Sequence, residues 1–138
     1  MNESSATLQS LLKEKGYSLT KPRELVLSRL LGKEPMTMRE LLSSMGNEID
    51  RASVYRTIAV FEETGVTQRL SIGWKYKIEL TDNFADHHHH LTCSVCKKII
   101  PINEQELENF IYKAAAQNNF YANRHQVEIQ GTCAACRA

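Results

Sequence analysis

The chain has 138 residues, with 17 basic and 16 acidic side chains and a formal net charge of +1. This length allows one medium domain or two small ones. No apolar run approaches the roughly 20 residues of a membrane span, and residues 1–17 lack the long apolar core of a signal peptide. We therefore expect a cytoplasmic protein whose thiols stay reduced.

Charge alone gives no reason to expect nucleic-acid binding. Residues 1–83 contain 12 basic and 11 acidic side chains, and the remainder contains five of each. The only local excess lies between Lys13 and Arg39, where seven basic residues outnumber three glutamates. A case for DNA binding must therefore rest on a structural motif.

Four helices are expected in the first half of the chain. Leucines recur at helical spacing in residues 8–12, and the later helices open at a proline or at a side chain that can cap them. The first helix includes Leu8, and the later three are expected to open near Pro22, Thr37 and Asp50. The second helix is expected to end by Gly32, the third at Gly46 and the fourth at Gly65.

Two alternating segments follow the fourth helix. Apolar and polar residues alternate over residues 66–70 and again from Trp74 to Leu80, around a short turn at Ile72 and Gly73. This pattern predicts a two-stranded hairpin. A helix-turn-helix followed by a hairpin is typical of a winged-helix DNA-binding domain.

The polar segment 81–86 is expected to be a hinge between two domains, residues 1–82 and 83–138. Beyond it, strand-like segments flank one helix that Asn103 and Glu106 could cap. The apolar stripe of this helix consists of Leu107, Phe110, Ile111, Ala114 and Ala115. A further strand is expected over residues 127–131, so the predicted fold class is α+β.

The fourth helix has one apolar face and one face that suits DNA, at roughly 100° per residue. The inward face is expected to contain Val54, Ile58 and Phe61. The opposite face contains Ala52, Tyr55, Arg56 and Ala59. Alanines allow a close approach, arginine pairs with guanine or phosphate, and a tyrosine ring touches a thymine methyl. Lys21 and Arg23 are candidates for holding phosphates, although solvated surface charges are the alternative for all these side chains.

Two C-x-x-C pairs, Cys93/Cys96 and Cys133/Cys136, are separated by 36 residues. Each pair points two thiolates at one centre, and two pairs complete the tetrahedron that zinc prefers. Four protein ligands leave no open position, so the expected ion is a structural Zn2+. Disulfides or buried free thiols are the alternatives, which a reducing compartment disfavours.

Four consecutive histidines precede the first cysteine pair. Since neighbouring side chains of a strand point to opposite faces, His87 and His89 should face one way and His88 and His90 the other. One run can therefore supply two sites, whereas a solvated polyhistidine stretch would supply none. Further ligands must come from elsewhere, and the candidates are Glu79, Glu108 and His125.

These features together resemble the ferric uptake regulator (Fur) family of bacterial metal-sensing repressors, from about Leu8 to Arg137. The resemblance rests on Thr20, Pro22 and Arg23, on Ala52 to Arg56, on Glu79 to Thr81, on the histidine run with Leu91, Cys93 and Cys96, and on Gly131 to Cys133 with Cys136. It implies a winged-helix DNA-binding domain followed by a small α/β dimerisation domain. It also implies a homodimer that, when loaded with a divalent metal, binds an inverted-repeat operator in double-stranded DNA.

By position, the resemblance implies three metal sites. The structural zinc site is Cys93, Cys96, Cys133 and Cys136. A second site in the dimerisation domain is His87, His89, Glu108 and His125. A regulatory site at the hinge includes Glu79, His88 and His90. The candidate DNA-binding residues are Lys21, Arg23, Arg51, Ala52, Ser53, Tyr55 and Arg56.

The hinge site departs from the family pattern at two positions. The chain has Met36 where the family usually supplies a histidine, and Pro101 where it often supplies a carboxylate. A thioether is a poor ligand for a hard divalent ion, and proline offers no side-chain ligand. Glu79 favours iron or manganese over zinc, whereas His89 resembles some zinc-uptake regulators. The regulatory metal is therefore Fe2+, Zn2+ or Mn2+, with zinc-uptake and peroxide-responsive subclasses as alternatives.

Two other classes of function are alternatives to a repressor. A zinc hydrolase or deaminase needs an open zinc position, and the sequence lacks the H-E-x-x-H and H-x-E with P-C-x-x-C motifs. We therefore expect no enzyme. A zinc-stapled adaptor would use the apolar helix and edge strands of the second half to bind another protein, without binding DNA.

Overall fold

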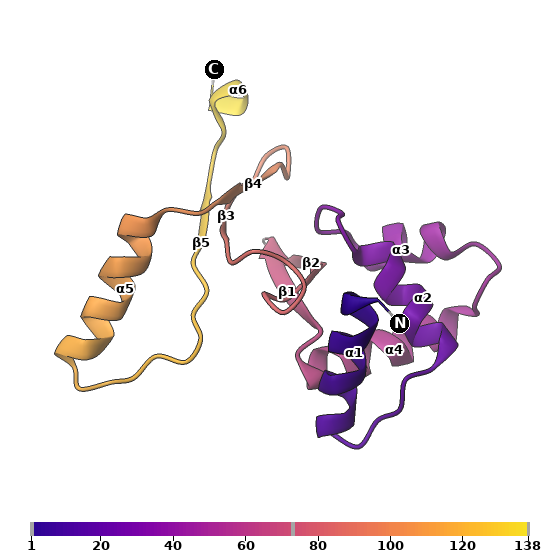
Figure 1. The fold of residues 1–138 in the computed structure, drawn as a ribbon. Helices are drawn as coiled ribbons and strands as arrows, with labels where there is room; N and C mark the ends of the chain where they lie inside the picture. The colour runs from indigo at the N-terminus through magenta and orange to yellow at the C-terminus, as the bar shows by residue number, and fades with distance from the viewer. Residues whose placement is uncertain (1, 73, 138) are drawn as a thin grey trace. The chain divides into compact units, whose positions relative to one another are not determined.

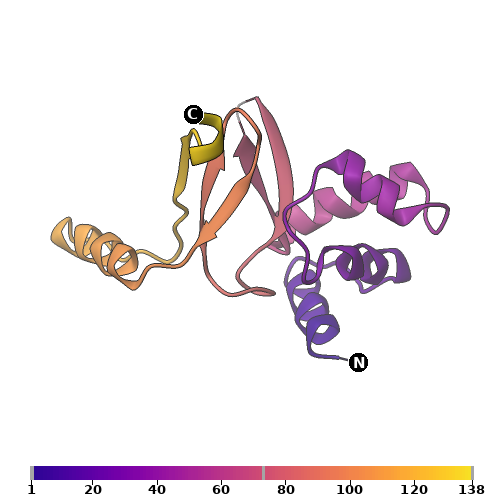
Figure 2. The ribbon, with the colours of Figure 1, turned by 90° about the horizontal axis from the view of Figure 1, so that it is seen from above.

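The computed structural model describes residues 2–72 and 74–137 and divides the chain into two compact units, Met1–Asp86 and His87–Ala138. The first unit contains a two-stranded sheet and the second a three-stranded sheet, each accompanied by helices (Figures 1 and 2). This arrangement confirms the predicted α+β class. Within the described residues, every helix is too short or too polar to cross a membrane.

Four helices open the first unit: α1 (Glu3–Glu14), α2 (Lys21–Leu30), α3 (Met38–Met45) and α4 (Arg51–Thr64). Each begins after a side chain that accepts a hydrogen bond from a first-turn backbone N–H. The capping residues are Asn2, Thr20, Thr37 and Asp50. Helix α4 ends at Gly65, whose φ of 78° is a conformation that glycine adopts without strain. The expected starts and ends of α2, α3 and α4 are confirmed.

The core of the first unit joins these helices to the sheet that follows. Val54, Ile58 and Phe61 of α4 are buried, as their spacing predicts, and Thr57 is buried beside them. The same core cluster contains buried side chains from the other helices and the sheet, namely Leu8, Leu12, Val26, Leu41, Val66 and Ile78. This packing fixes α4 by one face and leaves its other face to solvent.

The predicted hairpin is formed by β1 (Thr67–Ile72) and β2 (Lys75–Leu80), which pair antiparallel. Trp74 lies ahead of β2 instead of beginning it, and its side chain is 89% exposed. After β2, the hydroxyl of Thr81 donates to the carbonyl oxygen of Gly65 at 2.6 Å. The first residue of the expected hinge is therefore bonded to the end of α4.

The second unit is built on strand β3 (His89–Cys93), which pairs antiparallel with β4 (Ile99–Ile102) and parallel with β5 (Glu128–Gly131). Helix α5 (Gln105–Gln117) connects β4 to β5, and the short helix α6 (Ala134–Arg137) follows. Both views show α5 extending away from this sheet (Figures 1 and 2).

The predicted start of α5 is wrong. Its N-cap residue is Glu104, whose side chain makes no capping hydrogen bond, so Asn103 does not cap the helix. Glu106 and Glu108 lie in the first turn, where carboxylates interact favourably with the positive end of the helix dipole. These charges stabilise the helix start in place of a cap.

Candidate metal centres and DNA-facing helix

The two cysteine pairs converge because β3 and β5 run side by side. Cys93 is the last residue of β3 and lies opposite Gly131 of β5, and the N–H of Ser94 donates to the carbonyl oxygen of Gly131 at 2.9 Å. Cys133 precedes α6 and Cys136 lies within it. All four sulfur atoms lie within 4.8 Å of one another.

The chemistry of this sulfur cluster fits zinc. A tetrahedron with Zn–S bonds of about 2.3 Å has S···S edges of about 3.8 Å, and the sulfurs of Cys96 and Cys133 are 3.8 Å apart. Backbone N–H groups of Cys133 and Cys96 lower the pKa of the Cys93 thiol to about 6. Hydrogen bonding to Cys133, followed by burial, raises the pKa of Cys136 to about 12. Without a cation, the crowded thiols cannot all lose their protons, so the pKa of one falls while that of another rises. A bound cation would stabilise all four thiolates together.

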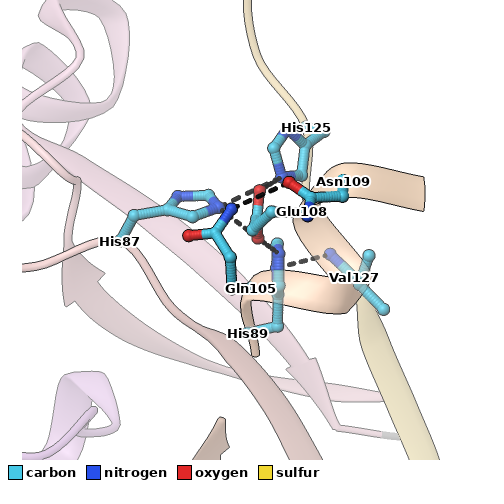
Figure 3. A network of polar contacts seen from close by, with 7 residues as sticks. All are labelled: His87, His89, Gln105, Glu108, Asn109, His125 and Val127. Atoms are coloured by element: carbon cyan, nitrogen blue, oxygen red, sulfur yellow. Dashed lines mark hydrogen bonds and ion pairs between the residues drawn. The ribbon is translucent and has the colours of Figure 1, made fainter. Parts of the chain in front are cut away.

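A second cluster brings together side chains from β3 with its preceding residues, from α5 and from the segment before β5 (Figure 3). Its members are His87, His89, Glu108 and His125. Oε1 of Glu108 lies 3.0 Å from Nε2 of His87 and 2.5 Å from Nε2 of His89, while its Oε2 lies 2.7 Å from Nε2 of His125. Three imidazoles and a carboxylate are ligands suited to zinc, iron or manganese.

The Glu108 carboxyl is in its charged form. Burial raises its pKa, but the hydrogen bond from His89 and the nearby His87 and His125 together bring the pKa below its ordinary value. A carboxylate at neutral pH can bind a divalent cation without first losing a proton.

His89 can bind a metal through Nε2 only if the position of its ring proton changes. The backbone N–H of Val127 donates to its Nδ1 at 3.1 Å, so the neutral ring carries its proton on Nε2 and donates that proton to Glu108. Metal-binding histidines ordinarily donate from their second ring nitrogen. Binding a metal here therefore requires the proton to move to Nδ1 and the bond from Val127 to open.

The sequence did not indicate Val127 or Tyr112 as neighbours of this cluster. The ring of Tyr112 stands edge-on to His125, with centroids 5.5 Å apart. Tyr112 follows Glu108 by four residues on α5, and side chains at that spacing share a helix face, so this neighbour could have been found. The contact of Val127 depends on strand pairing, which the sequence pattern does not specify.

The three residues predicted for the hinge site belong to different units. Glu79 lies on β2, where its Oε1 accepts a hydrogen bond from Nε2 of Gln68 at 2.9 Å. His88 and His90 lie in the second unit, with ring centroids 4.7 Å apart. The rings of His87 and His89 are also 4.7 Å apart, so the run alternates as a strand predicts. A joint site of the three side chains stays a prediction.

The two positions that depart from the family pattern lie beside these predicted hinge ligands. Met36 and Ile78 exchange two backbone hydrogen bonds, which puts Met36 next to the strand that carries Glu79. Pro101 lies directly opposite His90 in the pairing of β3 with β4. The chain thus lacks a ligand side chain at two places adjacent to the residues expected to bind metal.

The outward face of α4 consists of the side chains predicted to lie there. Ala52, Arg56 and Ala59 are exposed, and Tyr55 is 44% exposed. Nη2 of Arg56 donates to the hydroxyl of Ser53 at 3.0 Å, and this hydroxyl donates to the Asp50 carboxylate at 2.6 Å. The arginine is thereby tied to the cap of its own helix.

The remaining candidate DNA-binding residues lie at the starts of two helices. Lys21 is the exposed first residue of α2, and Arg23 follows it in the first turn. Arg51 is the first residue of α4, and its guanidinium lies 5.7 Å from the centre of the Tyr55 ring. Lys21, Arg23 and Arg51 thus all belong to the first unit.

Comparisons with a family model and with individual proteins both match this chain to the same family. A model of the ferric uptake regulator family matches residues 14–130. The ferric uptake regulation protein of Bordetella parapertussis is 32% identical over 135 residues, which cover 94% of this chain and 96% of that protein. The protein of the same name from Escherichia coli K12 is 33% identical over 131 residues, covering 89% of this chain and 86% of its own.

Solved structures show the same fold. The ferric uptake regulator of Vibrio cholerae matches with a TM-score of 0.71 at 26% identity, over 91% of this chain and 99% of its own. The Helicobacter pylori regulator matches with a TM-score of 0.80 at 23% identity, over 99% and 95%. From the family match and from these identities over nearly the whole length, this chain belongs to the ferric uptake regulator family.

Proposed function

We propose that this protein is a metal-dependent transcriptional repressor that controls genes of metal-ion uptake and homeostasis from the cytoplasm. Proteins of its family are DNA-binding transcription regulators that act as dimers, and they are not enzymes. The observation that carries the proposal is that one chain contains two clusters of metal-ligating side chains and also an exposed face of α4. That face consists of small residues together with Tyr55 and Arg56. An adaptor would need neither the second cluster nor that face.

Each cluster has a separate role in this proposal. The four cysteines hold a structural Zn2+ that stays bound, and the cluster of Glu108 with its three histidines holds a second divalent ion. Glu79, His88 and His90 supply an incomplete regulatory site at the hinge, residues 81–86, between the DNA-binding and dimerisation domains. Metal there would favour the arrangement in which two winged helices match two DNA half-sites, so affinity rises as that arrangement becomes more populated.

The homodimer is supported by the apolar surface of the second unit. No side chain of α5 or β5 is fully buried within the described residues. Several large apolar side chains of this unit are instead exposed to solvent, including Phe110, Tyr112, Phe120, Tyr121 and Ile129. An exposed set of this kind marks a protein interface, and a second copy of the same chain is the partner that the family's symmetric assembly provides.

Metal dependence of DNA binding tests the proposal directly. A duplex selected from a random-sequence pool by the metal-loaded protein should bind roughly 5- to 150-fold more tightly to that form than to chelator-treated protein. Fluorescence anisotropy with Fe(II), Mn(II) and Zn(II) buffered separately would measure this. The most effective ion then identifies the subclass, because relatives solved with iron and with manganese show that the family alone does not select the metal. Equal affinity in all states would refute a metal-dependent repressor.

Replacing Glu108 should remove the second metal. The Glu108→Ala variant loses the one anionic ligand of its cluster, so metal affinity there should fall by at least about 10-fold. Metal content measured during graded chelation should show one ion per chain leaving earlier than in the wild type, and the cysteine-bound zinc leaving last. Glu106→Ala is a matched control, since Glu106 is an exposed carboxylate in the same first turn of α5. Identical release from both variants would contradict the assignment of Glu108.

A further inference from the structure

A cleft of about 460 Å3 runs along α4 beside the start of α2. Its walls include Arg23 from α2 and Ser53, Arg56 and Glu63 from α4, with Tyr17 from the loop that precedes α2. Two guanidinium groups thus line one cleft next to the exposed face of the helix proposed to read DNA. Arginines are favoured partners for phosphate because their donors are arranged in a planar fork.

Tyr17 has a position fixed by backbone hydrogen bonds. Helix α1 ends at Glu14 with Lys15 as its C-cap, and Gly16 follows with a φ of +82°. The N–H of Tyr17 donates to the carbonyl oxygen of Leu12 at 2.9 Å. The N–H of Gly16 donates to the carbonyl of Lys13 at 3.0 Å, and these two bonds form a Schellman motif. The Tyr17 side chain also packs against the core, so its ring is a fixed platform.

Arg23 is held against this platform. Its guanidinium carbon lies 5.3 Å from the centre of the Tyr17 ring, and its Nη1 donates to the carbonyl oxygen of Ser18 at 2.5 Å. The hydroxyl of Tyr17 in turn donates to the carboxylate of Glu63 at 2.6 Å. Glu63 follows Arg56 by two turns of α4, about 10 Å at 1.5 Å per residue. The carboxylate of Glu63 therefore also belongs to this cleft, where it is bonded to the tyrosine hydroxyl.

We infer that this cleft seats one phosphate of the DNA backbone between Arg23 and Arg56, and that Tyr17, held by Glu63, is the positioning residue for Arg23. The inference rests on the proposed DNA-binding function. A long side chain that is already ordered loses less conformational entropy when it binds. Tyr17 therefore adds to affinity without touching DNA, and only through Arg23.

A double-mutant cycle tests this with metal-loaded protein and the selected duplex. Arg23→Ala should reduce the slope of log K against log salt by about 0.9 for each chain bound, because one phosphate contact is lost. Tyr17→Ala should weaken binding roughly 2- to 10-fold. In the Arg23→Ala background the same tyrosine change should have no further effect. Tyr17→Phe keeps the ring and should lose less than Tyr17→Ala.

Lys33→Ala is the charge-matched control, since Lys33 is exposed beyond the opposite end of α2 and does not line the cleft. An Arg23→Ala slope equal to that of this control would overturn the phosphate site. Equal losses from Tyr17→Ala with and without Arg23 would show that Tyr17 only supports the fold, which would overturn its positioning role. Failure of the metal-loaded wild type to bind any duplex would instead refute the proposed function itself.

Discussion

Cys93→Ser should release the proposed structural zinc and unfold the second unit while the first unit stays folded. Cys93 is the only apolar side chain that is fully buried among the described residues of the second unit, where its buried neighbours are His89, His90 and Thr92. A small unit with so few buried aliphatic side chains depends on a metal or a partner for stability. The zinc would join the end of β3 to the segment after β5, which are far apart in sequence.

Zinc analysis and hydrogen exchange would measure this outcome. The Cys93→Ser protein should carry one fewer zinc per chain, lose exchange protection in β3 and β5, and run as a monomer in sedimentation. Val95→Ala is the matched control, because Val95 lies in the same turn, is 64% exposed and contributes no sulfur. Normal protection and dimerisation of a zinc-free Cys93→Ser protein would show that the four cysteines do not stabilise this unit.

The first unit was predictable because its signals are local. Thr37 and Asp50 accept the capping hydrogen bonds predicted for them, and the stripe of α4 is buried as its spacing requires. A cap depends on residues three apart, so the sequence contains all the information needed. At α5 the same rule failed, since the first-turn carboxylates stabilise a helix that starts without a side-chain cap.

The metal clusters were predictable only in part. Alternation along a strand separates His87 and His89 from His88 and His90, and the C-x-x-C spacing pairs the cysteines. The grouping of Glu108 and His125 with His87 and His89 came from the family resemblance, because nothing local to Glu108 or His125 assigns either one to a particular site. The bond from Val127 to His89 and that from Tyr17 to Glu63 join residues 38 and 46 positions apart. Such contacts follow from the packing of elements and have no signal in the sequence pattern.

Replacing both Tyr55 and Arg56 by alanine should abolish specific DNA binding and leave the dimer intact. The two side chains stand on the exposed face of α4, away from Val54 and Ile58, so their loss should not disturb the core. Each contact of this kind to a base contributes about 1–3 kcal/mol, so the selected duplex should bind at least about 30-fold more weakly. Anisotropy with a labelled duplex would measure the affinity, and sedimentation would measure the dimer.

The same variant separates a repressor from a zinc-stapled adaptor. If the protein were an adaptor that uses the apolar surface of the second unit, changes on α4 would not affect its partner binding. The wild-type protein would then show no metal-dependent affinity for DNA. Lys33→Ala controls for the lost positive charge, because it changes an exposed lysine outside this helix. If the double variant bound the selected duplex as tightly as the wild type, α4 would not be the reading helix. If the double variant lost both DNA binding and dimerisation, the change would have damaged the fold. Single replacement of Arg56 would then decide between a repressor and an adaptor.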